Sequence, residues 1–212
     1  MRNGKGREFY DKEILKFEGE YLNGKKWNGK GFDLKGNIIY ELKNGIGNIK
    51  EYNSTGYLIF EGEYLKGEKN GKGKEYDYKG KLIFEGEYLN DMKNGKGKEY
   101  DNYNSRLKFE GEFLKGKRNG KGKEYNFFNG NLLFEGKYLN GQRNGKGKEY
   151  IDFKIKFEGE YLNGKRNGKG KEYDYEGKLI FEGEYINGKI RNGKKYDYND
   201  NNELIGEEEI VE

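Results

Sequence analysis

The sequence predicts an all-β fold, an elongated single-layer antiparallel sheet of tandem β-hairpin repeats. Three observations predict it. The chain repeats itself, apolar and polar residues alternate within each repeat, and 36 of its 212 residues are glycine while proline is absent. Strands point successive side chains to opposite faces, so alternation indicates strands, and glycines placed between them indicate turns.

The repeat is marked by the string F-E-G-[EK]-[YF]. From its second copy onward, successive copies start 23 to 25 residues apart, which is typical of a repeat array. The copies begin at Phe17, Phe60, Phe84, Phe109, Phe134, Phe157 and Phe181. The wider gap before Phe60 holds a shortened copy around Tyr40 to Tyr52, where we expect the sheet to bend or narrow.

We expect one repeat array over residues 1–212. A half repeat covers residues 1–16, and an acidic C-terminal cap covers residues 197–212. Full or shortened repeats start near residues 17, 38, 60, 84, 109, 134, 157 and 181. Half-units or caps at the ends fit the need of stacked repeats for atypical terminal units.

Each repeat reads as one hairpin. In residues 157–180, the stretch F-E-G-E-Y-L predicts the first strand and G-K-G-K-E-Y the second, with an Asn-Gly-rich turn between them. Asn and Gly tolerate the positive φ angles of tight turns. Residues 174–177, D-Y-E-G, predict a second turn that leads into the next repeat. A helix remains an alternative prediction only for the last ten residues.

Charge predicts the register of the hairpin. Opposite charges face one another, and two glycines face one another, if Tyr88 lies opposite Gly95. The other pairs are then Glu87 with Lys96, Gly86 with Gly97, Glu85 with Lys98 and Phe84 with Glu99. The facing glycines leave a trough in which we expect an aromatic ring of a neighbouring hairpin to lie against bare backbone.

Composition removes several functional classes. Cysteine and histidine are absent, so the thiolate nucleophile, the zinc-thiolate site and the usual neutral-pH general base are missing. The formal net charge is only +4, which does not indicate nucleic-acid binding. No stretch matches a membrane helix or a signal peptide. We expect no enzymatic activity, cofactor or metal, and a cytoplasmic location, free or in association with the cytoskeleton or a membrane.

Three motifs imitate chemical sites. Residues 197–208 place oxygen side chains at calcium-loop spacing, but Asn202 replaces the turn glycine and a strand precedes the segment. The G-K-G-K strings lack the Ser or Thr that follows Gly-Lys in a phosphate loop. Paired glutamates such as Glu85 and Glu87 recur in almost every repeat, whereas a catalytic pair needs a single enclosed pocket. All three patterns favour a structural role.

The repeat resembles the MORN repeat, whose pattern is Y/F-x-G-x-Y/W-x-x-G-x-x-x-G-x-G. The matching positions are Phe157, Gly159, Tyr161, Gly164, Gly168 and Gly170, and again Phe109, Gly111, Phe113, Gly116, Gly120 and Gly122. Tyr or Phe replaces the usual tryptophan, and Asp91 and Lys195 stand where glycine is expected. The resemblance implies an elongated interaction scaffold, with anionic phospholipid binding and homodimers among some members and an antitoxin-like branch among bacteria.

One candidate surface is an aromatic row on the first strand of the repeats. It consists of Tyr64, Tyr88, Phe113, Tyr138, Tyr161 and Tyr185. In a single-layer sheet these rings supply the packing, which is their structural interpretation. A long apolar groove with tyrosine hydroxyls also suits a partner helix or an extended peptide, so a protein partner bound along this groove is the functional interpretation.

A second candidate surface is a basic edge at the hairpin turns. It consists of Lys117, Arg118, Arg143, Lys165 and Arg166. An anionic membrane attracts such an edge, at roughly 1 kcal/mol per basic residue near the surface. The alternative is that these charges keep the protein soluble and protect the sheet edge.

Overall fold

A computed structural model describes residues 1–10 and 13–211. Strands and turns make up the chain, and the described part contains no α-helix, which confirms the all-β prediction. Two compact units are present, one of residues 1–106 and 113–116, the other of residues 107–112 and 117–212. Asp11 and Lys12 of the predicted half repeat, and Glu212 of the predicted cap, lie outside the described residues.

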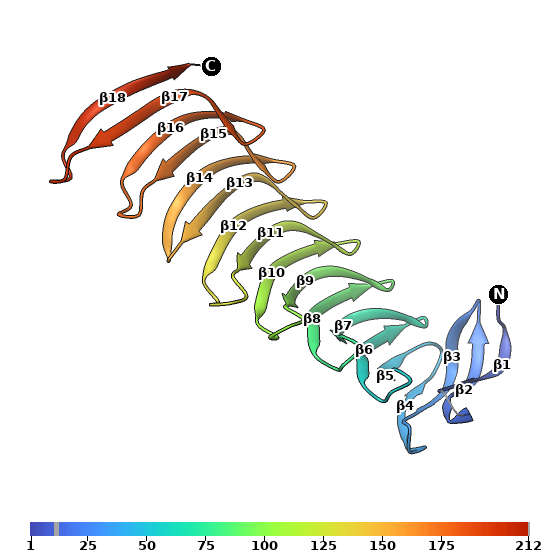
Figure 1. Cartoon of the computed structure of the whole chain (residues 1–212). Helices are drawn as coiled ribbons and strands as arrows, with labels where there is room; N and C mark the ends of the chain where they lie inside the picture. The colour runs from blue at the N-terminus through green and yellow to red at the C-terminus, as the bar shows by residue number, and fades with distance from the viewer. Residues whose placement is uncertain (11–12, 212) are drawn as a thin grey trace. The chain divides into compact units, whose positions relative to one another are not determined.

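The first unit holds two antiparallel sheets (Figure 1). Strands β1 to β4 form the first, and β5 to β9 follow one another in the second. Their bounds are β1 Gly4–Phe9, β2 Leu15–Leu22, β3 Lys25–Phe32, β4 Ile38–Leu42, β5 Gly47–Tyr52, β6 Leu58–Leu65, β7 Glu68–Tyr76, β8 Leu82–Leu89 and β9 Met92–Tyr100. Each neighbouring pair is antiparallel, as tandem hairpins require.

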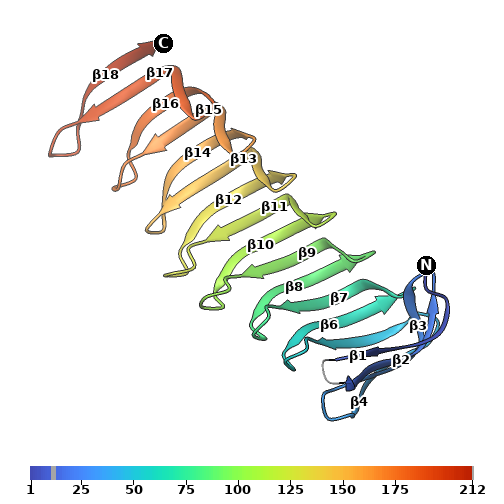
Figure 2. The ribbon, with the colours of Figure 1, turned by 45° about the vertical axis from the view of Figure 1, so that its right-hand side comes forward.

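The second unit is built of the same hairpins (Figure 2). Strand β10, Leu107–Leu114, contributes residues 107–112 to it. The others are β11 Lys117–Tyr125, β12 Leu132–Leu139, β13 Gln142–Ile151, β14 Lys154–Leu162, β15 Lys165–Tyr173, β16 Leu179–Ile186, β17 Lys189–Tyr198 and β18 Leu204–Val211. The last strand pairs with β17, so the end of the described chain is a strand and not a helix.

Strand pairing breaks at the shortened repeat, where we expected a bend or narrowing. Strands β4 and β5 belong to different sheets, and a single bridge between Lys43 and Ile46 joins them. A buried cluster fills this region of the first unit, formed by Phe17, Tyr21, Tyr40, Leu42 and Ile49. The shortened repeat therefore ends one sheet and starts the next.

The observed register confirms part of the predicted one. Phe84 faces Glu99, Glu85 faces Lys98, and Gly86 faces Gly97. The prediction that Tyr88 faces Gly95 is wrong, because Tyr88 lies opposite Lys93. The turn is a two-residue one at Asn90 and Asp91, which both have positive φ. The extra residues around the second Asn-Gly form a β-bulge, in which Gly95 has a φ of 96°.

Stacking of neighbouring hairpins explains the Asn-Gly pair at the bulge, which recurs even in the repeats whose turn carries Lys66-Gly67, Asn90-Asp91 or Lys115-Gly116 instead. The amide of Gly141, in one turn, donates to the carbonyl of Arg118 in the preceding hairpin at 2.9 Å. The bulge residue Asn119 accepts a hydrogen bond from the amide of Asn140 at 3.3 Å. One Asn-Gly pair therefore makes a turn, and the other holds the turn of the next repeat.

The core is a line of phenylalanine rings lying on paired glycines. Gly159 faces Gly170, and a Cβ atom on Gly159 would lie 2.6 Å from Cζ of Phe157 and 2.7 Å from Cα of Gly170. Neighbouring rings meet edge to face, with 5.7 Å between the ring centres of Phe157 and Tyr161 and 5.3 Å between those of Phe157 and Tyr185. The predicted trough exists, and the ring that fills it comes from the same hairpin.

Candidate functional site

The predicted aromatic row lies in this core. Tyr88, Phe113, Tyr138, Tyr161 and Tyr185 are between 2% and 4% exposed, and Tyr64 is half-buried beside Phe60. Their structural interpretation therefore accounts for their positions. A partner resting on the sheet would touch little of these rings. Binding along the row stays a prediction.

The predicted basic edge divides into two kinds of residue. Lys117 and Lys165 are exposed beside the turns. The arginines instead lie over the core, with the guanidinium of Arg143 4.1 Å from the ring centre of Phe134. Arg118 covers Phe109 at 4.1 Å and Arg166 covers Phe157 at 4.0 Å. Their placement on an exposed edge is corrected, because each follows a two-residue turn and enters the strand on the phenylalanine face.

These arginines form a ladder of ion pairs with glutamates. Arg143 contacts Glu124 at 2.6 Å and Glu149 at 3.4 Å, and Arg166 contacts Glu149 at 2.6 Å. Burial opposes ionisation of Glu124, but hydrogen bonds from Arg143 and Tyr138 hold its pKa below the ordinary value of 4.5. The same holds for the pKa of Glu149, through Arg166 and Tyr161. Because the glutamates of the ladder neutralise the charge of these arginines, the arginines would attract an anionic membrane only weakly.

The opposite face of the sheet is polar. There the hydroxyl of Tyr173 donates to Glu158 at 2.7 Å, and burial and this bond raise the pKa of Tyr173 to about 12. Lys148 contacts the same glutamate at 3.2 Å. Tyr76, Tyr100, Tyr125 and Tyr150 make equivalent bonds to the glutamates of their own hairpins. On this face, hydrogen bonds and ion pairs among tyrosine, glutamate and lysine side chains thus take the place of a second layer of apolar packing.

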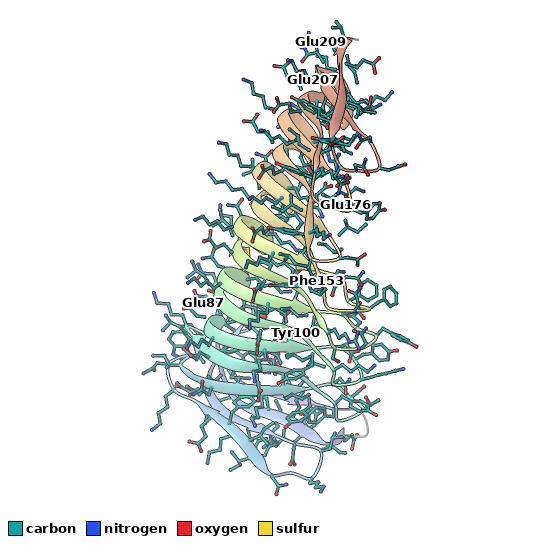
Figure 3. The ribbon with its side chains drawn as sticks, turned by 90° about the vertical axis from the view of Figure 1, so that its left-hand side faces the viewer. Glu87, Tyr100, Phe153, Glu176, Glu207 and Glu209 are labelled. Atoms are coloured by element: carbon teal, nitrogen blue, oxygen red, sulfur yellow. The ribbon has the colours of Figure 1, made fainter. Side chains whose placement is uncertain are left out.

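The most exposed aromatic residues of the described chain lie in the loops that connect one hairpin to the next. They are Tyr78 and Tyr103 in the first unit, and Phe128, Phe153 and Tyr175 in the second, each between 70% and 84% exposed. Figure 3 shows Phe153 and Glu176 at the loop edge of the sheet. We call these five residues the loop-tip aromatics. Sequence reasoning missed them because their segments read only as turns.

An acidic or amide side chain fixes most of these loops. Oδ1 of Asp77 accepts hydrogen bonds from the amides of Lys79 and Lys81, at 2.8 and 2.9 Å, with Tyr78 between them in the sequence. Asp174 holds the amides of Glu176 and Lys178 in the same way. Such turns satisfy their own backbone and need no ring for their geometry. The rings make only local contacts, such as the 4.2 Å between the ring centres of Phe127 and Phe128 and the 5.3 Å between Nζ of Lys79 and the ring centre of Tyr78.

Phe153 occupies an unfavourable backbone conformation. It forms a two-residue turn with Asp152, and its φ is 68°. An aromatic residue is rare at positive φ and costs about 1 kcal/mol there, whereas glycine is relaxed. A bulky ring held at a strained and exposed position is a feature that stability does not explain.

The described residues offer no chemical centre of the usual kinds. They contain no group of three or more metal-ligating Asp, Glu, His or Cys side chains. They also contain no helix with the length and apolar character to cross a bilayer. The segment with calcium-loop spacing forms a turn instead, in which Asn199 accepts bonds from the amides of Asn201 and Glu203.

A family model described as the MORN repeat matches the chain five times, at residues 60–81, 84–105, 109–126, 134–152 and 157–178. The chain is a MORN-repeat protein. Each match begins at the core phenylalanine of a hairpin and includes its glycine pair and bulge. MORN repeats generally form non-catalytic scaffolds. The family match thus agrees with the hairpin fold.

Other comparisons add little. No curated protein matches the sequence. A crystal structure of TcdB2-TccC3 is 11% identical over 97% of this chain, with a TM-score of 0.27 and 12% of that chain covered. The Photorhabdus luminescens Tc holotoxin pore is 11% identical over 91% of this chain, with a TM-score of 0.25 and 13% covered. The MORN-repeat chain spans a small part of those proteins, and similarity at this level carries no argument about function.

Proposed function

We propose that this MORN-repeat protein is a non-catalytic scaffold that binds a protein partner through its loop-tip aromatics. The observation that carries the proposal is Phe153, an aromatic ring that is 76% exposed on a backbone with a φ of 68°. Aromatic residues are enriched where proteins bind one another, because a rigid ring buries a large area at a small entropy cost. An antitoxin-like role would be one instance, with the toxin as partner.

The loop tips recur at the period of the repeat. In the second unit, Phe128, Phe153 and Tyr175 follow one another in successive connections between hairpins. A helix or an extended peptide crossing the loops would meet one ring per repeat, which is the spacing that an elongated partner needs. A second copy of the chain would satisfy the same surface, and light scattering of the purified protein identifies that case.

A peripheral membrane module is the second candidate. Exposed aromatic residues favour the interface of a bilayer, and Lys79 and Lys154 stand next to Tyr78 and Phe153 in the sequence. Cosedimentation with vesicles, with and without anionic lipid and at two salt concentrations, tests it. We expect no binding to either vesicle, and salt-sensitive binding to the anionic vesicle alone would replace the scaffold proposal.

Affinity capture from the source cells tests the scaffold with two variants. The first carries Phe128→Ser, Phe153→Gly and Tyr175→Ser. The matched control carries Leu139→Ser, Leu162→Ser and Ile186→Ser, three residues that are between 44% and 49% exposed beside the hairpin turns. We expect the first variant to lose the captured protein and the control to keep it. Retention by both variants, or loss in the control alone, would contradict the proposal.

A further inference from the structure

One repeat breaks the charge alternation on the polar face. Across the connections between hairpins, Lys72 faces Glu87 and Lys169 faces Glu184. Lys121 faces Lys137 instead, because the fifth copy of the string reads F-E-G-K-Y. Like charges directly opposite one another destabilise a sheet. The position of Lys137 therefore has a cost that its sister repeats avoid.

A third lysine extends the cluster. Lys137 faces the bulge that contains Lys146, on the other side of its hairpin. All three lysines are exposed, and within the described residues none of their ammonium groups forms an ion pair. Glu112 and Glu160 flank the three lysines in the same row, which confines the excess positive charge to three adjacent strands.

The sister repeats show which chemical group belongs at this bulge. In four of them a glutamate oxygen lies over the bulge glycine, in the pairs Glu63 with Gly71, Glu87 with Gly95, Glu112 with Gly120 and Glu160 with Gly168. Glu112 also accepts a hydrogen bond from the amide of Lys121 at 3.2 Å. A Cβ atom on Gly145 would instead meet carbon atoms of the Lys137 side chain, the nearest of them Cδ at 3.5 Å. The bulge at Gly145 therefore lacks the carboxylate that lies over the bulge glycine in the four sister repeats.

We propose that Lys121, Lys137 and Lys146 bind an acidic segment of the protein partner, whose carboxylates supply the charge that this repeat lacks. This inference rests on the proposed function and names the chemistry of one contact. Strands lie about 4.8 Å apart, so the cluster spans roughly 10 Å, enough for two or three carboxylates. A long polyanion such as nucleic acid would meet the flanking glutamates.

Binding of an acetylated tetraglutamate peptide at low salt tests the site. The variants are Lys137→Glu, which restores the alternation, and Lys169→Glu, which changes the net charge equally but lies outside the cluster. We expect Lys137→Glu to weaken binding at least tenfold and Lys169→Glu to weaken it less than twofold. Equal losses would mean that only net charge matters, and would overturn the proposal. A single-stranded oligonucleotide bound more tightly than the peptide, and released by Lys137→Glu, would overturn it as well.

Two further measurements distinguish loss of the lysine site from misfolding of the variant and from failure of the proposed scaffold function. Lys137→Glu should raise the thermal midpoint, because it removes a like-charge pair, and a lower midpoint would contradict the electrostatic account. Partner capture by Lys137→Glu should be weaker than by the natural chain. Undiminished capture by Lys137→Glu, together with loss in the loop-tip variant, would reject the lysine site and leave the scaffold function standing.

Discussion

The two units cover their phenylalanine rings with different cations. In the first unit Lys69 and Lys93 lie over Phe60 and Phe84, with 4.0 and 4.1 Å between the nitrogen and the ring centre. Both contact Glu75, at 3.3 and 3.5 Å. In the second unit arginines take these places at the same height above the rings. A lysine or an arginine thus occupies this position in the five hairpins that start at Phe60, Phe84, Phe109, Phe134 and Phe157, whereas Ile190 takes it in the last hairpin.

The difference shows what arginine adds to a stacked repeat. Arg143 joins the glutamate of the preceding hairpin, Glu124, to that of its own hairpin, Glu149. A guanidinium binds two carboxylates at once in fixed directions, whereas an ammonium is a point charge. We therefore expect the second unit to be coupled more tightly from hairpin to hairpin.

Removal of a core phenylalanine ring should lower the free energy of unfolding more than any other change, and by the same amount in both units. Phe84→Ala and Phe157→Ala should each lower the free energy of unfolding by about 3–5 kcal/mol, because each empties a fully buried site over a glycine pair. Urea unfolding measures this. Phe128→Ala, on an exposed loop, is the control and should change stability by less than about 0.5 kcal/mol. Unequal costs for the two core rings would mean that the units differ in more than their cations.

Removal of the cation should reveal the difference between the units. Arg143→Ala should cost about 1–3 kcal/mol, because it strips two half-buried glutamates of a partner, and Lys93→Ala should cost less than about 1 kcal/mol. The two free-energy changes are measured by denaturant unfolding, with hydrogen exchange as the probe of each unit. The same cost for the two variants would refute the ladder as a source of extra coupling.

Acid should weaken the arginine ladder. The pKa values of Glu124 and Glu149 lie below the ordinary 4.5, so their contribution is complete above about pH 4.5 and is lost as the pH falls through their values in the folded protein. Unfolding measured from pH 6 to pH 2 should show this loss. The Glu124→Gln and Glu149→Gln double variant should lose part of the pH dependence. An unchanged profile would show that the ladder does not contribute.

Exchange of the cations should have the smallest effect. Lys93→Arg should raise, and Arg143→Lys should lower, the free energy of unfolding by less than about 1 kcal/mol, since both keep the charge over the ring. Thermal unfolding of the two variants in the same buffer measures the signs. Opposite signs would mean that lysine is the better partner for these rings.

Much of the fold could be predicted from the sequence because the repeat constrains it. Gly86 faces Gly97 and Glu85 faces Lys98, and both pairings follow from the charges and the glycine spacing alone. The turn could not be placed, because each repeat offers two Asn-Gly-like pairs that are locally equivalent. Stacking decides between them, and stacking is a contact between repeats that local propensity does not contain.

The misplaced turn also explains why the basic surface was predicted at an edge. In the predicted register residues 89–94 form the turn, which makes Lys93 a turn residue. In the structure the turn is two residues long, so Lys93 lies opposite Tyr88 on the phenylalanine face. The loop-tip aromatics escaped prediction for a related reason. A turn motif such as D-Y-E-G explains its Asp and Gly by backbone geometry and leaves its Tyr without any stated role.

Strand aromatics form the core of the hairpins, and we propose that the loop-tip aromatics bind the partner. Chemical modification of tyrosine, mapped by mass spectrometry with and without the captured partner, tests both halves at once. We predict that Tyr78, Tyr103 and Tyr175 react first in the free protein and are protected in the complex, while Tyr88 and Tyr161 react in neither state. Equal reactivity of Tyr88 and Tyr175 in the free protein, or a complex that leaves the loop tips as reactive as before, would contradict the account.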